Sequence, residues 1–576
     1  MSSSSPVEQI KERSRQLRGT LAEALRDATS AHFSETDAQI LKFHGSYQQD
    51  DRDRRAELRK AGLDKDWIFM IRTKTPGGRL SAAQYLTLDR LAETVGNGTL
   101  RITTRQGIQL HGIRKIDLRR AVAEIVSSGI LTWGACGDVV RNTLATPVPV
   151  ADPIHRRLQD LAAELSQIFF ARSRAYSEVW IDGEPLSLGE GSAPEEEPIY
   201  GATYLPRKFK IAIALPPRND IDVFSNDLGL VAHASGQDVE GYTLLVGGGH
   251  GMTHGLRQTQ PRLAEPLFYV PRERVREAAI AVVTAQRDYG NREDRKRSRL
   301  KYLLLDRGID WFRGEVASRL DFVPEPPRPF SFTTVADPLG WHEQGDGKLF
   351  LGLFVQNGRI LDREDGPRLR QALRQAAIDF GLPIRLTANG NLFLADVARE
   401  RKAQLDELFA KHGVSTAPPR TATRSVGHAC VALPTCGLSL AESERVFPAL
   451  MDEIDRILEE LGLRDEPILI RMSGCPNGCS RPYNADLSFV GRSPGKYAFY
   501  AGGSLAGDRL AGLERRSVGL DEIPTLVRGY LEAFVRERLP EESFSQYWAR
   551  TRPRGPLPSP DQFHEEAVEA KAAGPA

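Results

Sequence analysis

Four of the five cysteines lie within fifty residues of one another, at a spacing that could hold a metal centre. They are arranged as Cys430-x5-Cys436, then 38 residues, then Cys475-x3-Cys479. Four thiolates suit a zinc ion or an iron–sulfur cluster. Zinc ribbons and fingers prefer two or four intervening residues, so gaps of five and three fit them poorly. Glycines flank three of the ligands and leave room for a bulky group. The spacing favours a cluster, with zinc or buried thiols as alternatives.

The segments around these cysteines predict how they could meet. Residues 441–462 have helical periodicity, and residues 466–472 are typical of a strand that ends at the motif GCPNGC. Each cysteine pair is therefore expected on a loop at the end of an element, and two such loops can converge on one site. Cys136 lies almost 300 residues away and is predicted to be an ordinary buried cysteine.

A second group of residues is cationic. The segment LRITTRQGIQLHG, residues 100–112, places apolar side chains at even positions and polar ones at odd positions. A continuous strand would put all the polar ones on one face. They are Arg101, Thr103, Arg105, Gln109 and His111. A solvated outer face is the ordinary explanation; the functional one is a face that binds a polyanionic ligand.

Other cations lie in or near apolar segments. Arg72 lies within the apolar strand predicted for residues 68–74, and Arg141 follows the sequence CGDVV. Lys208 and Lys210 alternate out of a strand opening and share a face. A cation within an apolar strand usually has a partner or a ligand. For each one alone, a surface ion pair is the simpler explanation.

An internal repeat positions these residues. The first copy consists of a strand at 68–74, the motif PGGRL at 76–80, a helix capped by Ser81, and a closing strand at 100–112. The second consists of a strand at 349–355, NGRIL at 357–361, a helix from near Pro367, and a closing strand at 384–395. The copies lie about 280 residues apart and indicate a duplicated α+β architecture with a pseudo-twofold relation. Chance similarity is the alternative.

Length and composition set outer limits. A chain of 576 residues is too long for one core. Its formal net charge is +1, so no overall positive field attracts nucleic acid or an anionic membrane. There is no run of 18 apolar residues for a membrane span and no secretory leader, so we expect a cytoplasmic protein without a nucleic-acid or membrane partner. GGGHG lacks the spacing of a dinucleotide site.

Six segments together carry a family resemblance. They are FHGSYQQDDRDRR at 43–55, LRITTRQGIQLHG at 100–112, TYLPRKFK at 203–210, LLVGGGHG at 244–251, VTAQRDYGNREDRK at 283–296 and GCPNGC at 474–479. With the cysteine spacing, they resemble the hemoprotein (beta) components of assimilatory sulfite reductase, in the siroheme-dependent sulfite and nitrite reductase family. The resemblance covers nearly the whole chain.

The resemblance implies two cofactors and their residues. A 4Fe-4S cluster would be bound by Cys430, Cys436, Cys475 and Cys479. Siroheme would take Cys479 as its axial ligand, with Arg101, Arg105, Gln109, His111 and Asn477 as further cofactor-binding residues. The substrate-side cations would be Arg72, Arg141, Lys208 and Lys210. Arg299 stands where related chains carry lysine, which keeps the charge but not the proton donation, so it is a doubtful catalytic residue.

The implied fold has two ferredoxin-like half-repeats and two siroheme/4Fe-4S-binding lobes, duplicated about a pseudo-twofold. The expected divisions are an N-terminal arm at 1–64, the first half-repeat at 65–145, the first lobe at 146–330, the second half-repeat at 331–420, and the cluster lobe with the C-terminal tail at 421–576.

The implied activity is the six-electron reduction of sulfite to sulfide, for sulfur assimilation and cysteine biosynthesis. No flavin or NADPH-binding region is visible in the sequence, so the electrons would come from an NADPH-fed flavoprotein alpha subunit or from ferredoxin. The alternatives are a nitrite reductase of the same family, a zinc-stapled binding protein, and a degenerate homologue without cofactor. The intact cysteines and basic positions argue against the last.

Overall fold

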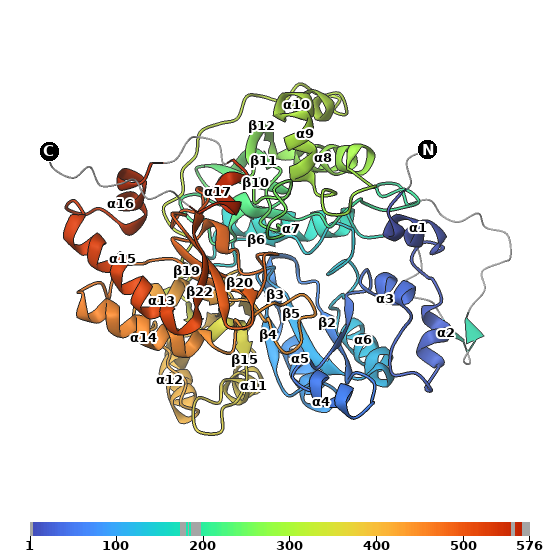
Figure 1. Ribbon diagram of the computed structural model, residues 1–576, viewed down its shortest axis with the longest axis horizontal. Helices are drawn as coiled ribbons and strands as arrows, with labels where there is room; N and C mark the ends of the chain where they lie inside the picture. The colour runs from blue at the N-terminus through green and yellow to red at the C-terminus, as the bar shows by residue number, and fades with distance from the viewer. Residues whose placement is uncertain (1–3, 173–179, 182–183, 186–196, 554–558, 567–576) are drawn as a thin grey trace. The chain divides into compact units, whose positions relative to one another are not determined.

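The computed structural model describes residues 4–172, 180–181, 184–185, 197–553 and 559–566. The chain forms two compact units, each with its own apolar core. Unit 1 comprises Met1–Gly248, Ala264–Phe332 and Asp337–Pro418, and unit 2 comprises Gly249–Leu263, Thr333–Ala336 and Pro419–Ala576. Both units mix helices with sheets, which confirms the α+β class (Figure 1). Within the described ranges, no helix has both the length and the apolar character to cross a membrane.

Unit 1 contains two five-stranded sheets built on one plan. The first has the order β1-β2-β5-β4-β15 and the second β13-β14-β17-β16-β3. The first sheet consists of β1 (Ser46–Asp50), β2 (Trp67–Arg72), β5 (Ile108–Ile113), β4 (Leu100–Ile102) and β15 (Arg359–Ile360). The second consists of β13 (Gly340–Glu343), β14 (Leu349–Leu353), β17 (Leu392–Val397), β16 (Ile384–Leu386) and β3 (Arg79–Leu80). Each sheet ends on a strand from the other repeat, so the two halves exchange strands.

Two matching turns make this exchange possible. Gly78 precedes β3 with φ +74°, and Gly358 precedes β15 with φ +75°. A Cβ atom on Gly78 would lie 2.3 Å from the Leu386 carbonyl oxygen, and one on Gly358 would lie 2.4 Å from that of Ile102. Both positions therefore need a residue that has no side chain and tolerates positive φ. This explains the shared glycine in PGGRL and NGRIL.

A helix covers each sheet of the repeat. Helix α5 (Ala82–Thr94) begins at a capping box in which the Ser81 hydroxyl accepts from the Gln84 N–H. Its predicted apolar face is buried. Helix α11 (Leu369–Phe380) is the equivalent in the second copy and packs against α5. Arg370 of α11 donates to Asp89 of α5 at 2.6 Å, so the two repeats are also joined by a buried ion pair.

The closing segments are hairpins, and the prediction of single continuous strands is wrong. Residues 100–112 form β4, a turn and β5. In the turn, the Thr103 hydroxyl accepts from the backbone N–H groups of Arg105 and Gly107, each at 3.2 Å. Thr387 makes the equivalent turn between β16 and β17. A side-chain acceptor competes here with the strand ladder for backbone donors. Arg105 therefore lies in a turn and not on the strand face.

The duplication extends to two further sheets, one in each unit. Unit 1 has the order β12-β11-β10-β9-β6, and unit 2 has β22-β21-β20-β19-β18. In both, counted as written, two antiparallel pairings are followed by two parallel ones. The unit 1 strands are β6 (Leu144–Ala145), β9 (Ile211–Ala214), β10 (Leu228–Ser235), β11 (Asp238–Val246) and β12 (Glu265–Pro271). The unit 2 strands are β18 (His428–Ala429), β19 (Ile470–Ser473), β20 (Leu487–Ser493), β21 (Lys496–Ala501) and β22 (Gly512–Gly519).

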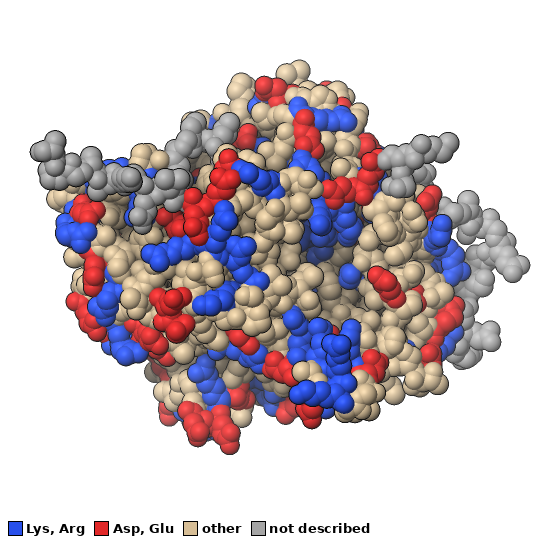
Figure 2. Space-filling model, viewed as in Figure 1, with Lys and Arg blue, Asp and Glu red and all other residues tan. Residues whose placement is uncertain are grey.

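The remaining helices are divided between the two units. In unit 1 they are α1 (Pro6–Arg13), α2 (Leu21–Arg26), α3 (Glu35–Leu41), α4 (Arg55–Lys60), α6 (Leu118–Ser127), α7 (Pro153–Ile168), α8 (Val275–Tyr289), α9 (Leu300–Arg307), α10 (Ile309–Ala317) and α12 (Lys402–Lys411). In unit 2 they are α13 (Ala422–Val426), α14 (Phe447–Glu460), α15 (Ile523–Glu537), α16 (Phe544–Thr551) and α17 (Asp561–His564). Basic and acidic side chains are interspersed on the face shown in Figure 2, in keeping with the near-zero net charge.

Candidate functional site

The four clustered cysteines lie beyond the ends of two neighbouring parallel strands of unit 2. Cys430 directly follows β18, and Cys475 follows β19 after one glycine. Two contacts join the strand ends: the Cys430 N–H donates to the Met472 carbonyl at 3.1 Å, and the Gly474 N–H donates to Cys430 Sγ at 3.2 Å. The two cysteine loops therefore meet at one edge of the sheet.

The thiols at this edge affect one another. Burial, together with the neighbouring Cys479 and Cys436, raises the pKa of Cys430 to about 12. Burial likewise raises the pKa of Cys475 to about 12, with Cys479 and Cys430 adding to the effect. Bound metal reverses this preference, because a coordinating thiol loses its proton. We call these four residues the cysteine centre.

The cysteine centre fits an iron–sulfur cluster by its donor set. Four thiolates with backbone N–H donors to sulfur are what such a cluster requires. Among the described residues, no three His, Cys, Asp or Glu side chains surround a position for a single metal ion. The ligands of a polynuclear cluster stand farther apart than those of one ion. Gly474 makes the approach possible, because a Cβ atom there would lie 2.2 Å from Ser439 Oγ.

Asn477 lies within this centre. Its Nδ2 group donates to Cys475 Sγ at 3.4 Å, so Asn477 contacts one of the predicted ligand sulfurs. Cys479 is the exposed member of the four, whereas Cys475 is buried. Cys479 is thus the ligand with room to contact a second group.

Four polar side chains form a row across the first sheet of unit 1, which we call the cation row. Arg72 of β2 faces Gln109 of β5, Gln109 faces Arg101 of β4, and Arg101 faces Arg359 of β15. With the Gln109 amide turned so that its oxygen faces Arg72, this oxygen accepts from Arg72 Nη2 at 2.7 Å. Arg101 is only 5% exposed, and Arg72 and Arg359 are half-buried, so this is not a fully solvated outer face. Three guanidinium groups on one face favour anionic groups.

His111 lies two residues beyond Gln109 on β5 and so shares its face. Burial and the nearby Arg359, Arg101 and Arg72 hold the pKa of His111 well below its ordinary value, so the imidazole is neutral. Among the described residues, its buried Nδ1 has no hydrogen-bond partner. An orphaned ring nitrogen beside three arginines fits a site completed by a polycarboxylate such as siroheme.

The sequence analysis missed Arg359. This residue belongs to NGRIL of the second repeat and reaches the first sheet only through strand exchange. Its Nη1 donates to Thr99 Oγ1 at 3.0 Å. The match between NGRIL and PGGRL could have drawn attention to Arg359. A local motif, however, does not indicate which sheet a two-residue strand joins.

Arg105 lies apart from the cation row, in the β4–β5 turn. Its guanidinium donates to Asn226 Oδ1 at 2.7 Å, to the Ile211 carbonyl at 2.9 Å and to the Asn142 carbonyl at 2.5 Å. Burial, with nearby Arg141, lowers the pKa of Arg105 to about 9. These bonds tie the hairpin to β9, and the contact of Arg105 with siroheme stays a prediction.

The other predicted cations lie on two adjacent segments of unit 1. The Phe209 N–H donates to the Val139 carbonyl at 3.0 Å, and the Arg141 N–H donates to the Phe209 carbonyl at 2.8 Å. Arg141 Nε donates to the Gly137 carbonyl at 2.7 Å, and this bond orients the guanidinium group. Arg141, Lys208 and Lys210 are therefore held on paired backbone.

Lys208 is the most perturbed of these cations. Burial holds its pKa well below the ordinary value, and the neighbouring charges of Arg207, Lys210, Arg299 and Arg141 lower it further. Such mutual repulsion means that these cations share one neighbourhood. An anion placed among them would relieve the repulsion.

Arg299 is a partner of Asp227. Its Nη2 donates to Asp227 Oδ2 at 2.7 Å and to the Gly248 carbonyl at 3.1 Å. The same carboxylate oxygen accepts from the Lys210 N–H at 3.0 Å. The pair fixes the start of Lys210's strand, which supports a structural role for Arg299. The basic run at 290–301 is otherwise a loop until α9 begins.

Cys136 is buried but lies against a predicted site residue. Arg72 Nη1 donates to Cys136 Sγ at 3.3 Å, and the Tyr47 ring lies 5.8 Å from the same guanidinium. The sequence indicated only burial, because distance along the chain concealed this contact.

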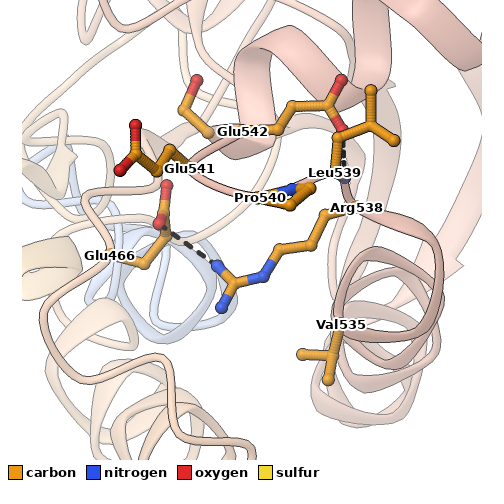
Figure 3. Close-up of a pocket in the computed structure, with 8 residues that line it drawn as sticks. Glu466, Val535, Arg538, Leu539, Pro540, Glu541 and Glu542 are labelled. Carbon is orange, nitrogen blue, oxygen red and sulfur yellow. Dashed lines mark hydrogen bonds and ion pairs between the residues drawn. The ribbon is translucent and has the colours of Figure 1, made fainter.

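A surface pocket of about 440 Å³ lies elsewhere in unit 2 (Figure 3). Glu466 and Arg538 face each other across it as an ion pair at 3.7 Å. Leu539 and Glu541 complete its rim. None of the cysteines or predicted cations lines this pocket, so it is separate from the candidate site.

Two family descriptions match the chain. The nitrite/sulfite reductase ferredoxin-like half domain matches residues 62–128 and 342–412, which carry the two strand-exchanged repeats. The nitrite and sulphite reductase 4Fe-4S domain matches residues 168–323, which include β9 to β12 of unit 1. The cysteine centre lies outside that range, in the unit 2 sheet of the same strand order.

Named relatives match almost end to end. The sulfite reductase (NADPH) hemoprotein beta-component of Myxococcus xanthus is 44% identical over 556 residues, covering 96% of this chain and 97% of that protein. The protein of the same name from Geobacillus thermodenitrificans is 44% identical over 546 residues, 95% of each chain. The structure of the Mycobacterium tuberculosis NirA protein matches with a TM-score of 0.76 at 25% identity, covering 94% of this chain and 96% of that one. With its duplicated half domains and its cysteine centre, the chain belongs to the nitrite and sulfite reductase family, among the sulfite reductase hemoprotein beta-components.

Proposed function

We propose that this chain is the catalytic hemoprotein subunit of an assimilatory sulfite reductase, which reduces sulfite to sulfide with six electrons and so supplies cysteine biosynthesis. The observation that carries the proposal is the cysteine centre, in which four thiols meet at one sheet edge of a chain 44% identical to hemoprotein beta-components. The cation row with its orphaned His111 nitrogen gives independent support for a bound polycarboxylate.

The residues present suit both cofactors of the family. The cysteine centre would hold a 4Fe-4S cluster, and Arg101, Arg105 and Arg359, with Gln109 and His111, would face siroheme and its carboxylates. When bound, these groups supply the electron transfer and the iron at which sulfite is reduced. Asn477 would keep Cys475 oriented through its hydrogen bond to sulfur.

Substrate binding is assigned to Arg141, Lys208 and Lys210, together with Arg72 at the end of β2. Fixed positive charges bind the sulfite oxygens and stabilise the negative charge that accumulates during reduction. The reaction also consumes protons, since the oxygens leave as water. Burial and neighbouring cations hold the pKa of Lys208 below its ordinary value, so Lys208 is the proposed proton donor.

An NADPH-fed flavoprotein alpha subunit is the proposed electron donor, with ferredoxin as the alternative. The related hemoprotein beta-components are named as parts of NADPH sulfite reductases. Leu438, two residues after Cys436, is 67% exposed, and Leu440 is also exposed. Exposed apolar side chains beside a redox centre suit a protein partner. We also place the reaction in the cytoplasm, where thiols remain reduced.

The spectrum of the protein tests the proposal first. The chain would be purified anaerobically from a host that makes siroheme, and its visible absorption and iron content measured. We expect heme bands, about four non-heme irons per chain, and sulfite-dependent oxidation of a reduced dye. A colourless protein that contains zinc would contradict the proposal. Faster turnover of nitrite than of sulfite would reassign the substrate.

A further inference from the structure

Helix α1, near the labelled N-terminus in Figure 1, is fixed to the segment that carries Lys208 and Lys210. Lys11 of α1 is only 1% exposed, and its ammonium donates to the Leu205 carbonyl at 2.8 Å. Glu8, one turn earlier, pairs with the same ammonium. A buried ammonium is costly unless its charge and its donors are matched, so these contacts hold α1 in one place.

Asp138 is the second anchor of this arrangement. Its buried carboxylate pairs with Arg295 at 2.9 Å, with Arg207 at 3.5 Å and with Lys11 at 3.9 Å. Burial would raise the pKa of Asp138, but these three cations hold it below its usual range, so the group stays ionised. The Asp138 carbonyl accepts from the Leu205 N–H at 3.1 Å. Leu205 is thus held at its N–H by Asp138 and at its carbonyl by Lys11.

The start of the segment is held as well. Arg292 Nη2 donates to the Tyr204 carbonyl at 2.7 Å, while Arg292 Nη1 donates to Glu8 at 2.5 Å. The Ser5 N–H, at the N-cap of α1, donates to the Arg292 carbonyl at 3.0 Å. Tyr204 has φ +58°, which is uncommon for a bulky residue and persists only where the surroundings impose it. Arg292 at the Tyr204 carbonyl and Lys11 of α1 at the Leu205 carbonyl hold the backbone on this position and the next.

We propose that α1 is a positioning element for sulfite binding: Lys11, with Glu8 and Asp138, fixes residues 204–210 so that Lys208 and Lys210 present their ammonium groups in one arrangement. Lys11 contacts no substrate and acts through Leu205, three residues before Lys208. The inference rests on the proposed function, because it assumes that these lysines bind sulfite. The competing explanation is that α1 only adds stability to unit 1.

Lys11→Met tests this inference, because methionine keeps the length and loses the donor and the charge. Glu12→Ala, an exposed position on the same helix, is the matched control. Both would be made as cofactor-loaded full chains. For Lys11→Met we expect unchanged heme absorption and iron content, a KM for sulfite raised about tenfold and a kcat within about twofold of wild type. Spectral titration with sulfite should show the same loss of affinity, and Glu12→Ala should match wild type.

A loaded Lys11→Met protein with wild-type KM and titration would overturn the inference, even if its melting temperature fell. If that variant does not accumulate folded, Glu8→Gln keeps the shape and removes one charge, and we expect its KM to rise about threefold; an unchanged KM would again overturn the inference. Wild-type protein that fails to reduce sulfite would contradict the proposed function itself, which distinguishes the two failures.

Discussion

Lys74 is a charged residue enclosed by apolar groups. It is buried in unit 1, and its Nζ has no hydrogen-bond partner among the described residues. The rings of Trp133 and Phe170 lie 5.8 and 6.0 Å away. Burial lowers the pKa of Lys74 to about 8 from 10.5. The folded protein therefore carries a charge that it would be more stable without.

Lys74→Met should raise the melting temperature at pH 7. Below pH 8 the lysine is charged in both the folded and the unfolded state. Burying this charge then lowers the free energy of unfolding by on the order of 3 kcal/mol. Between pH 8 and 10.5 the unfolded chain binds more protons, so wild-type stability rises with pH and the gain from methionine shrinks. Thermal unfolding of both proteins at pH 7 and pH 10 measures this. If the variant were less stable than wild type at both pH values, the conclusion that the Lys74 charge destabilises the folded protein would be wrong.

Two cysteine variants should differ in their spectra. Cys430 accepts from the Gly474 N–H inside the centre, whereas Cys479 is exposed and has room for a second group. Cys430→Ser should mainly lower the non-heme iron content, while Cys479→Ser should change both the iron content and the heme absorption. Parallel iron analysis and visible spectra of the two proteins check this. A normal heme spectrum in Cys479→Ser would remove the bridging role that the family resemblance implies.

Among the elements, those with local signals were predictable from sequence and those made by distant pairing were not. Helix α5 could be predicted from Ser81 onward, because its capping box and its apolar stripe both lie within one helix. The exchange of β3 and β15 was hidden, because a two-residue strand has no periodicity and its partner lies about 280 residues away. The hairpin at 100–112 was missed because alternation continued across a turn made by Thr103.

Strand exchange predicts an effect for Arg359, which β15 brings to the cation row. Arg359→Met should lower heme absorption per chain and leave the non-heme iron content unchanged, because the cysteine centre belongs to unit 2. Arg363→Met, an exposed position beyond the strand, is the control. Heme and iron assays on the purified variants measure the effect. Equal heme content in both variants and wild type would show that Arg359 makes no contribution to cofactor binding.

At the scale of the whole molecule, the duplicated architecture carries its chemistry unequally. In the second sheet, Phe393 and Arg385 pair in register where the first sheet pairs Gln109 and Arg101. The cysteines occur in only one of the two sheets that share the order of parallel and antiparallel strands. Each of the two kinds of sheet therefore occurs twice, but only one copy of each kind carries the reactive side chains. The difference between the two copies can be seen in the sequence, because the composition of each copy is local information.

The proposed electron donor is a separate flavoprotein, and Leu438 predicts where that protein would dock. This side chain is 67% exposed and lies two residues from Cys436. Leu438→Asp should lower NADPH-driven sulfite reduction with the flavoprotein about fivefold, because a charge replaces an apolar contact, while reduction by a small dye stays within about twofold of wild type. Leu539→Asp, 53% exposed on the rim of the surface pocket, should leave both rates unchanged. Equal losses with flavoprotein and dye would mean that Leu438 supports the cysteine centre itself, and no loss with either would place the docking surface elsewhere.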